Sequence, residues 1–472
     1  MVTVQDLEKV RSDNKLEKFI IETISAHNVS ALEKNMLYYE GKNPYLTKLK
    51  IEVELADGNV LDLTPKAKIY SAFAQIIIDH GVSRLWDNPV QLDDNIDREI
   101  LGVNFDEDVH EYARMAAIHG VSWVFYNNGA PIMFPATDFI PLPDEWDGEV
   151  RAGIRFWQID PKKPMVIQLY EMDGFIEWRK EDGKDQLTPV DAAGAPTPKA
   201  TKRSYRTNKP VGGQGYVETT AETPGAEYAE FPVVPYYPNP KRTSELTGPV
   251  KSSINFYDEK NTVYSDEIIM EKGFMWSVSG YGGQAKDLTE LVEKARKLRI
   301  IADRRLDGDA QIDVSTTEAP YLSHKEAMDA AEAAIFRDAR IMNPNVLMSG
   351  GVTTVAIRAA MQREDKKMVG VETEARRFVR RLLKVAGVES KLIAFKHRTL
   401  VNELEIVQML AQGVSDLPFE YQVKLNPAIP ADMQQGIIDA KAKEQLAYDE
   451  AAIAEIERKM AEARAAGEQN NG

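Results

Sequence analysis

The spacing of apolar and polar residues predicts two long helices joined by a short loop in the second half of the chain. Alanines and other apolar residues recur beside charged ones through 324–343. This helix should stop at Asn343, because Pro344 disfavours helical geometry in the residue before it. A second helical pattern covers 352–385, with apolar residues three, four or seven apart. The loop between them, 344–353, contains a Ser-Gly-Gly turn sequence, and we expect it to form an exposed tip.

The first 182 residues contain both helical and strand periodicities. Helical spacing predicts two helices within 1–40, the second with Ser30 and Glu33 in a capping-box pattern, and further helices at 66–86 and 107–119. Short apolar runs and alternating patterns between turn residues predict strands at 49–55, 121–126, 132–134, 151–159, 166–170 and 175–179. This mixture predicts an α+β fold.

Residues 183–229 differ in composition, because Gly, Pro, Ala and Thr dominate and periodic apolar positions are few. Such a segment is typical of an exposed loop or a loose hairpin with solvated charges. An alternative is that its basic group contacts phosphate. That group consists of Lys199, Lys202, Arg203, Arg206 and Lys209.

Order is expected to resume with an extended segment at 231–240 and a long helix at 245–273. A small module follows at 274–322. Its pattern predicts a strand at 275–278, a helix at 288–298 and a strand at 310–314. Roughly fifty residues cannot bury much core alone, so we expect the module to pack against its copies in neighbouring subunits.

The C-terminal part is predicted to be mainly helical. A strand at 392–397 leads to helices at 402–410 and 433–466. In the last helix Leu446, Ile453 and Met460 lie seven residues apart. A monomeric core helix, a coiled coil and a ring of packed helices all fit this stripe.

Composition bounds the function. The formal net charge is −16, from 74 acidic and 58 basic residues, which argues against tight DNA binding over the whole surface. An acidic protein could still let DNA slide past without adhering. The absence of cysteine excludes disulfides, thiolate metal sites and a cysteine nucleophile. Neither a signal peptide nor an apolar run long enough to span a membrane is evident, so we expect an intracellular chain without membrane contact.

Motifs for catalysis are almost absent. The segment Ser279–Lys286 is Gly-rich but lacks the G-x-x-x-x-G-K-[ST] pattern of a phosphate loop. The Ser-Gly-Gly at 349–351 does not match G-x-S-x-G. The six histidines show no metal-ligand spacing. We therefore expect no enzyme activity, no cofactor and no metal.

One acidic run has the spacing of a calcium loop. Asp307, Asp309, Gln311, Asp313 and Glu318 match the ligand positions of an EF-hand, but Ile312 occupies the position that requires glycine. The alternation around Ile312 favours a turn followed by an edge strand.

Six short motifs stand out along the chain: Tyr38–Lys42, Leu85–Val90, Ala117–Val124, Phe231–Asn239, Asn255–Asp266 and Ser349–Gly351. In content and order they resemble those of portal proteins of tailed bacteriophages, of the type with long non-contractile tails, and the resemblance runs from about Leu32 to Ile456. Two positions depart from the family pattern: Asp87 replaces a glycine, and Val352-Thr353 replaces part of the Ser-Gly-x-Ala-Leu loop motif.

The resemblance implies a portal fold, α+β with a wing, a helical stem, a small α/β clip and a helical crown, assembled as a ring that is usually a dodecamer. The implied parts are a wing at 1–244 with a flexible insertion at 183–229, stem helices at 245–273 and 323–343, a clip at 274–322, a tunnel loop at 344–353, a long helix with the wing return at 354–400, and a crown at 401–472.

The resemblance also implies the partners. Double-stranded DNA would pass through the ring without sequence specificity during packaging and ejection, and ATP hydrolysis would belong to the terminase motor docked at the clip. Major capsid, scaffolding, head completion and tail adaptor proteins would contact the ring. The location would be one vertex of the virion capsid, after assembly in the host bacterial cytoplasm.

The DNA channel residues implied by the resemblance are those of the tunnel loop: Asn345, Val346, Leu347, Met348, Ser349, Gly350 and Gly351. Lys325, Arg337 and Arg340 on the preceding helix are candidate channel charges. Alternatively these cations form ion pairs on the helix surface with Asp329, Glu332 or Asp338.

Two other classes of protein remain as alternatives. One is an α+β enzyme acting on nucleic acid, such as a nuclease or transferase. The other is a non-viral scaffold that oligomerises through the C-terminal helix. Particle size separates a ring from an enzyme, which would typically be a monomer or dimer.

Overall fold

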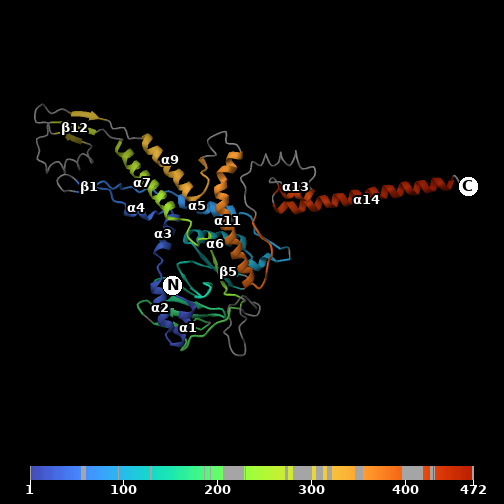
Figure 1. The fold of residues 1–472 in the computed structure, drawn as a ribbon, viewed down its shortest axis with the longest axis horizontal. Coiled ribbons are helices and arrows are strands. Elements are labelled where there is room, and N and C mark those ends of the chain that lie inside the picture. Colours follow the sequence, from blue (N-terminus) through green and yellow to red (C-terminus); the bar gives the residue numbers. More distant parts are fainter. Residues whose placement is uncertain are drawn as a thin grey trace. The chain divides into compact units, whose positions relative to one another are not determined.

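Two helices, a three-stranded sheet and part of a long helix enclose the larger hydrophobic core (Figure 1). The two helices are α5 (Phe73–Trp86) and α6 (Phe105–His119), and the three strands are β4 (Ser122–Asn127), β5 (Ala130–Phe134) and β11 (Val233–Tyr236). The strands are antiparallel in the order β11-β4-β5. Phe125 of β4 and Phe378 of α11 (Thr354–Val385) are both buried in this core. The helix predicted at 107–119 and the strand at 121–126 are confirmed.

The computed structural model describes a defined set of residues, which fall into two units. They are 2–54, 60–93, 95–127, 130–184, 186–191, 193–205, 228, 230–271, 275–279, 300–303, 312–315, 321–345, 354–395, 418–425, 429 and 431–469. The first unit comprises Met1–Val352 and Ile357–Arg398, and the second comprises Thr353–Ala356 and Thr399–Gly472. The mixture of helices and sheets confirms the α+β class.

A second core lies between a five-stranded antiparallel sheet and the first two helices. Its elements are α1 (Val4–Ser12), α2 (Leu16–Ala26), β6 (Phe139–Pro143), β7 (Val150–Trp157), β8 (Met165–Tyr170), β9 (Phe175–Lys180) and β10 (Leu187–Pro189). Ile20 is buried there, with Leu16, Phe19 and Ile24 packed beside it, so these four residues form the apolar face of α2. The sequence pattern missed β6, whose two prolines suit the edge position that it occupies.

Residues 187–205 are more ordered than predicted for an exposed loop. β10 pairs with β9, and Tyr205 is fully buried in the larger core. Lys202 forms ion pairs with Glu171 and Asp173, and Arg203, only 6 % exposed, lies 3.3 Å from Glu177. Lys202 and Arg203 therefore form ion pairs within the protein, which argues against their contacting phosphate. Arg206 and Lys209 lie outside the described residues.

The segment before α5 corrects the prediction of a helix over 66–86. The helix begins only at Phe73, after α3 (Ser30–Tyr39), α4 (Pro44–Lys48) and the hairpin of β1 (Glu52–Glu54) and β2 (Val60–Asp62). The Ser71 amide donates instead to Asp258 Oδ1 at 3.0 Å, a tertiary bond that replaces a helical one. Ser30 is likewise the first helical residue of α3 rather than its cap, and Val29 at the N-cap makes no side-chain bond.

Two antiparallel helices form an extended arm of the first unit. α7 (Gly248–Glu271) packs along α9 (Tyr321–Ala339), and α11 follows α9 after the segment 346–353 (Figure 1). The buried positions of α7 recur every four residues and include the polar residues Asp258 and Thr262. Tyr257 and Tyr264, on the neighbouring side of the helix, are only partly buried.

α9 ends four residues earlier than the predicted stop at Asn343. Arg340 adopts a left-handed backbone with φ 58°, and the Ile341 amide donates to Phe336 O at 3.0 Å. This hydrogen bond joins residues five apart and is typical of a C-terminal helix cap with a left-handed residue. The cap therefore ends the helix before the effect of Pro344 on its preceding residue applies.

A three-stranded sheet follows α7, in the order β13-β12-β14. β12 (Met275–Ser279) and β14 (Ile312–Ser315) confirm the two predicted strands, and β13 (Ile300–Asp303) was not predicted. Asp313 lies inside β14, in register with Ser277, as expected for the strand interpretation of the acidic run. The predicted helix at 288–298 and the other acidic positions of that run lie outside the described residues.

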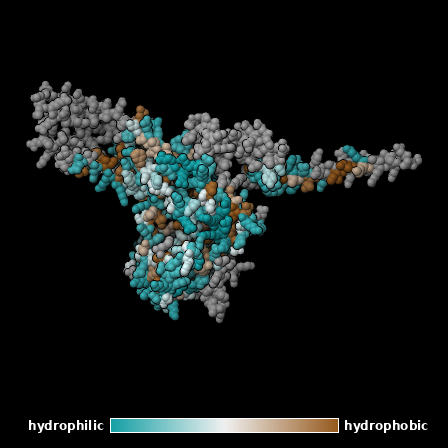
Figure 2. Space-filling view, in the orientation of Figure 1, coloured by the Kyte–Doolittle hydropathy of each residue, from teal (hydrophilic) through white to brown (hydrophobic). Residues whose placement is uncertain are grey.

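The remaining elements of the first unit are short. They are β3 (Gln91–Leu92), the 3-10 helix η1 (Arg98–Leu101) and β15 (Ile393–Ala394), which pairs with β3. Figure 2 shows mostly hydrophilic residues over the body of this unit on the face in view. Among the described residues, no helix combines the length and the apolar character needed to cross a bilayer.

The second unit consists of α13 (Phe419–Leu425) and the 39-residue α14 (Ala431–Gln469). The predicted helix over 433–466 is confirmed, and that over 402–410 lies outside the described residues. Large apolar side chains on α14 are more than half exposed, and Figure 2 shows hydrophobic groups along it. They are Met433, Leu446, Ile453, Ile456 and Met460. The choice among the three interpretations of this stripe stays a prediction.

Candidate functional site

A buried cluster of charged groups joins α5 to the first half of α11. The Arg84 guanidinium binds the carboxylates of both Glu364 and Asp365. The side chains of Arg84 and Glu364 are only 8 % and 4 % exposed. We call the set of His80, Arg84, Glu364 and Asp365 the α5–α11 joint. A charge removed from water this fully needs a partner, so the two helices are coupled through this pair.

Two further groups complete the coordination of Glu364. His80 Nε2 lies 2.7 Å from Oε1, and the Met342 amide donates to Oε2 at 3.0 Å. Burial alone raises the pKa of Glu364, but the hydrogen bonds from His80 and Met342 and the charge of Arg84 outweigh it and lower the pKa to about 2. Glu364 is therefore ionised at neutral pH and holds the backbone just after α9.

Lys367, one turn further along α11, makes a second connection. Its ammonium donates to Ala339 O, the last residue of α9, at 3.0 Å and lies 2.6 Å from Glu245, just before α7. Gly370 packs on Pro240, where an added Cβ would lie 3.2 Å from the ring. The end of α9 and the first half of α11 are thus both fixed to the body. The two flanks of the predicted tunnel loop therefore have defined anchors.

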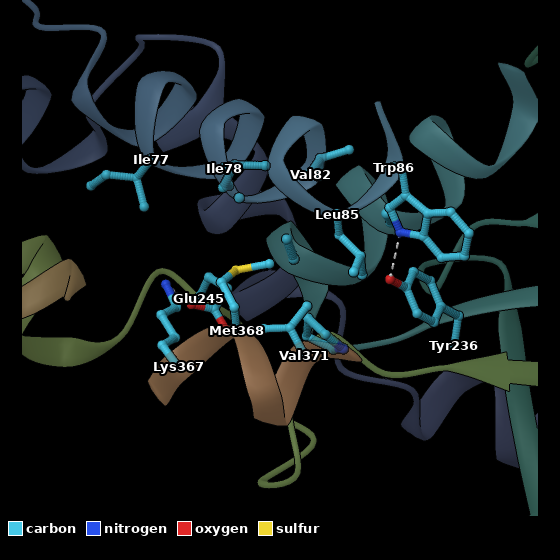
Figure 3. Close-up of a pocket in the computed structure, with 14 residues that line it drawn as sticks. Ile77, Ile78, Val82, Leu85, Trp86, Tyr236, Glu245, Lys367, Met368 and Val371 are labelled. Atoms are coloured by element: carbon cyan, nitrogen blue, oxygen red, sulfur yellow. Dashed lines mark hydrogen bonds and ion pairs between the residues drawn. The ribbon is translucent and has the colours of Figure 1, made fainter. Parts of the chain in front are cut away.

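The apolar space between α5 and α11 is small. Figure 3 shows Met368 and Val371 of α11 directed toward Ile78, Val82 and Leu85 of α5, around a cavity of about 40 Å³. A volume of this size holds only one or a few waters, because a single water needs about 10–15 Å³ measured in this way. The space is a packing defect in an interface rather than a pocket for a substrate.

A tyrosine and a tryptophan close one end of this interface. Trp86 Nε1 donates to Tyr236 OH at 3.0 Å, and the ring centroids lie 6.2 Å apart (Figure 3). The Tyr236 side chain also packs on Phe378 of α11, with centroids 4.8 Å apart. Two of the motifs that carry the family resemblance, Leu85–Val90 and Phe231–Asn239, therefore meet here.

Another pair of these motifs meets on α7. Tyr38 OH donates to Asn255 Oδ1 at 2.8 Å, and the side-chain amide of Asn43 donates to the buried Asp258 carboxylate at 2.8 Å. The Ile69 amide donates to Thr262 Oγ1 at 3.1 Å. Burial raises the pKa of Asp258, although the hydrogen bonds from Ser71 and Asn43 oppose this rise. These polar contacts fasten α7 to the N-terminal helices of the first unit.

A glycine fixes the approach of α7 to α6. Gly120 ends α6 with φ +93°, and a Cβ there would lie 2.9 Å from the Ser244 amide nitrogen. Ser244 Oγ in turn donates to Ile118 O at 2.7 Å. The motif Ala117–Val124 thus needs glycine both for its left-handed backbone and for close contact with the segment that leads into α7.

The predicted DNA-channel residues are only partly described. Asn345 is exposed, and its side-chain amide donates to Glu332 Oε1 at 2.8 Å. Val346, Leu347, Met348, Ser349, Gly350 and Gly351 lie outside the described residues. The prediction that this loop contacts DNA therefore stays a prediction.

The three candidate channel cations Lys325, Arg337 and Arg340 are all exposed on or after α9. Arg337 lies 3.1 Å from Asp338, which is one of the predicted surface ion pairs. Asp338 Oδ2 also accepts from Ser253 of α7 at 2.8 Å, so this carboxylate links the two helices. Whether any of these cations faces a channel stays a prediction.

Sequence reasoning missed the α5–α11 joint. A signal existed, because Glu364 interrupts the apolar stripe between Met361 and Met368, and Arg84 falls within the apolar stretch before Leu85 and Trp86. A charged residue on the core face of a helix needs a partner, but the pattern does not say which one. In the described parts of the chain, no group of three or more His, Asp or Glu side chains is placed to hold a metal ion.

Long helices held on an α+β body by buried ion pairs and hydrogen bonds, with a further long helix that exposes an apolar stripe, are typical of a subunit of a larger structural assembly. The family is given by sequence comparison: the model described as phage portal protein, SPP1 Gp6-like, matches residues 18–454, and the chain belongs to this family of tailed-phage portal proteins. Portal proteins are structural components of the phage capsid that serve genome packaging. A search of curated proteins found no match.

Proposed function

We propose that the chain forms a ring at one capsid vertex, through which double-stranded DNA is packaged and later ejected. The observation that carries this proposal is the anchoring of both flanks of 344–353. The flank before the loop is held by two hydrogen bonds, from the Met342 amide to Glu364 and from Lys367 to Ala339 O. Glu364 and Lys367 lie on α11, which forms the flank after the loop, so the same contacts hold both flanks together. A loop whose ends are fixed in this way can present a constant surface to a moving polymer.

The parts of the ring follow the order of the chain. Residues 1–244 and 354–400 form the wing, the helices within 245–273 and 323–343 the stem, 274–322 the clip, 344–353 the tunnel loop and 401–472 the crown. The small sheet β13-β12-β14 falls in the clip, and α14 falls in the crown. The ring is a dodecamer in a phage of the long non-contractile tail type.

The exposed stripe on α14 supports assembly from several copies. Leu446, Ile453 and Met460 are each 57–63 % exposed and seven residues apart. Burying one such side chain is worth about 1.5–3 kcal/mol, so a helix with several gains stability from a neighbouring copy. Neighbouring copies of α14 in the ring cover this stripe.

Charge suits a passage without adhesion. The net charge of −16 repels a polyanion over most of the surface, whereas the segment 345–351 carries no charged residue. DNA is therefore contacted in the channel mostly by uncharged groups. Lys325 and Arg337 on α9, with Arg340 just after it, add local positive charge.

The partners follow from this role. Terminase docks at the clip and supplies the ATP hydrolysis, and head completion and tail adaptor proteins replace it after packaging. Major capsid and scaffolding proteins surround the wing during assembly in the host bacterial cytoplasm.

Two measurements test the proposal. The purified protein, of 53.0 kDa per copy, should have an assembled mass of several hundred kilodaltons by native mass spectrometry and appear as rings in negative stain. Deletion of 344–353 should leave this mass unchanged and impair DNA packaging or retention in an infection complemented with the variant. A purely monomeric or dimeric wild-type protein would contradict the ring, and normal packaging without the loop would contradict the tunnel assignment.

A further inference from the structure

α11 has two faces of opposite character. Its inner face contributes Met368, Ala375, Phe378 and Leu382 to the larger core. The residues on the opposite side that do not pack on the body, placed by the 100° step of an α-helix, are Gln362, Lys366, Val369, Thr373, Arg377, Arg380 and Lys384. Four of these seven residues are cations, all exposed, and none is acidic. We call the four cations the basic row of α11.

The carboxylates of α11 do not neutralise the whole row. Glu364 and Asp365 bind Arg84 of α5, and Glu372 binds Arg376. Glu374 pairs with a member of the row, at 2.5 Å from Arg377, whose side chain nevertheless stays 58 % exposed. The helix therefore uses its acids for internal contacts and leaves positive charge facing solvent.

The groups around the C-terminal end of the row are also engaged. An open groove of about 650 Å³ runs beside Arg380, Arg381 and Lys384. Of its acidic lining residues, Glu149 pairs with Arg381, which lies outside the row, and Glu230 pairs with Lys384 of the row, whose side chain stays 53 % exposed. Within the described part of the chain, Lys366 and Arg380 have no carboxylate partner.

The length and spacing of the row fit a phosphate backbone. From Lys366 to Lys384 the helix rises about 27 Å, at about 1.5 Å per residue. Double-stranded DNA carries a phosphate every 3.4 Å of helix axis on each strand, so a row of this length lies beside roughly eight axial steps of the duplex and can contact phosphates where a strand passes it. Lysine and arginine on an exposed helix face are the side chains that make such sequence-independent contacts.

From this geometry we infer that the outward face of α11 is a second DNA-binding surface, distinct from the tunnel loop, that contacts the backbone of double-stranded DNA. The inference rests on the proposed DNA-handling role of the ring but concerns a different part of the chain. In a protein of net charge −16, attraction to DNA has to be local, and this row provides it. A protein surface rich in acidic side chains is the competing partner, and the test separates the two.

The test measures binding of the assembled full-length protein to a fluorescent 30-base-pair duplex by anisotropy, over a range of salt concentrations. The double variant Lys366→Gln/Arg380→Gln removes the two unpaired cations and breaks no ion pair. Lys162→Gln/Lys163→Gln removes the same charge from an exposed turn between β7 and β8 and serves as the matched control. Polyglutamate at equal charge concentration replaces the duplex in a parallel titration.

Loss of two phosphate contacts should weaken duplex binding about ten- to hundred-fold near 0.1 M salt and reduce the slope of log K against log salt by about two. The control variant and the 344–353 deletion should bind as the wild type does. Unchanged binding by the double variant overturns the inference, and so does equal binding of polyglutamate, which would indicate an acidic protein partner. Because assembled mass is measured on the same samples, failure of the ring is recognised separately from failure of this surface.

Discussion

Replacing Glu364 by glutamine should loosen the joint that anchors α11 to α5 and to the end of α9. The groups around the Glu364 carboxylate are all donors: the Arg84 guanidinium, the Met342 amide and His80 Nε2. A glutamine would place its own donor NH₂ against one of them and leave the Arg84 guanidinium, 8 % exposed, with a single carboxylate partner. The substitution therefore removes a buried ion pair and introduces a conflict between donors.

The expected cost can be worked out in two ways. Breaking a buried ion pair by removing one partner costs about 3–5 kcal/mol. Asp365, 58 % exposed, still binds Arg84, so the lower end of this range applies. A pKa lowered from 4.5 to about 2 corresponds to about 3 kcal/mol of stabilisation of the ionised carboxylate. Both routes give about 3 kcal/mol.

Two measurements check this value. Urea denaturation of the full-length variant should show destabilisation by about 3 kcal/mol. Native-state hydrogen exchange of the Met342 amide should accelerate by about a hundred-fold, since each 1.4 kcal/mol is a factor of ten. Glu22→Gln, which removes one partner of the exposed pair Lys18–Glu22, is the control and should cost less than about 1 kcal/mol.

Acid should produce the same loss in the wild type. Because the folded pKa of Glu364 is depressed, its contribution is fully present above pH 4.5 and is lost as the pH falls from 4.5 to about 2. The double variant Arg84→Met/Glu364→Leu should recover most of the stability, since it leaves no buried charge unpaired. If Glu364→Gln changes neither the unfolding free energy nor Met342 exchange, the joint does not hold the helix and the reasoning is wrong.

Three further predictions concern other parts of the chain. Burial lowers the pKa of His119 to about 4, so the free energy that its buried neutral ring contributes to folding is present above pH 6.5 and lost between pH 6.5 and 4. Calorimetric scans should show this loss of stability in the wild type and not in His119→Gln. Gly120→Ala should cost about 1–3 kcal/mol because of its positive φ and the contact with Ser244, whereas Gly81→Ala inside α5, with nothing within 4 Å of the new Cβ, should stabilise by about 1 kcal/mol in denaturant titrations. Ile453→Asp should weaken assembly about ten- to hundred-fold per interface by analytical ultracentrifugation, with Lys443→Gln as an inert control on the same helix, and an unchanged mass would show that α14 is not an interface.

The local sequence pattern was enough to predict the helices and strands whose apolar residues recur with a regular spacing. α6, α11 and α14 lie close to their predicted ranges, and so do the strands β7, β8 and β9. The reason is that an amphipathic stripe or an apolar strand fits only one kind of surface, whatever the partner is. Order and content of the motifs were also enough to indicate the portal family.

Tertiary structure decided the places where a distant residue supplies the partner. The segment 66–72 has a helical pattern but forms no helix, because the Ile69 and Ser71 amides bond to Thr262 and Asp258 on α7. Arg203 lies in a stretch that reads as a polar loop, yet the carboxylate of Glu177 and the carbonyls of Val190 and Asp191 draw it inside. Composition alone could not distinguish these cases from solvated ones.

The α5–α11 joint shows most clearly what the sequence pattern cannot predict. Arg84 and Glu364 are 280 residues apart in the chain, and each is, by local pattern, only a charge on an apolar helix face. The sequence by itself indicated that such charges need compensation if they are buried. Which carboxylate meets which guanidinium depends on how α5 and α11 pack, and that packing is set by the summed contacts of the whole core rather than by any short stretch of sequence.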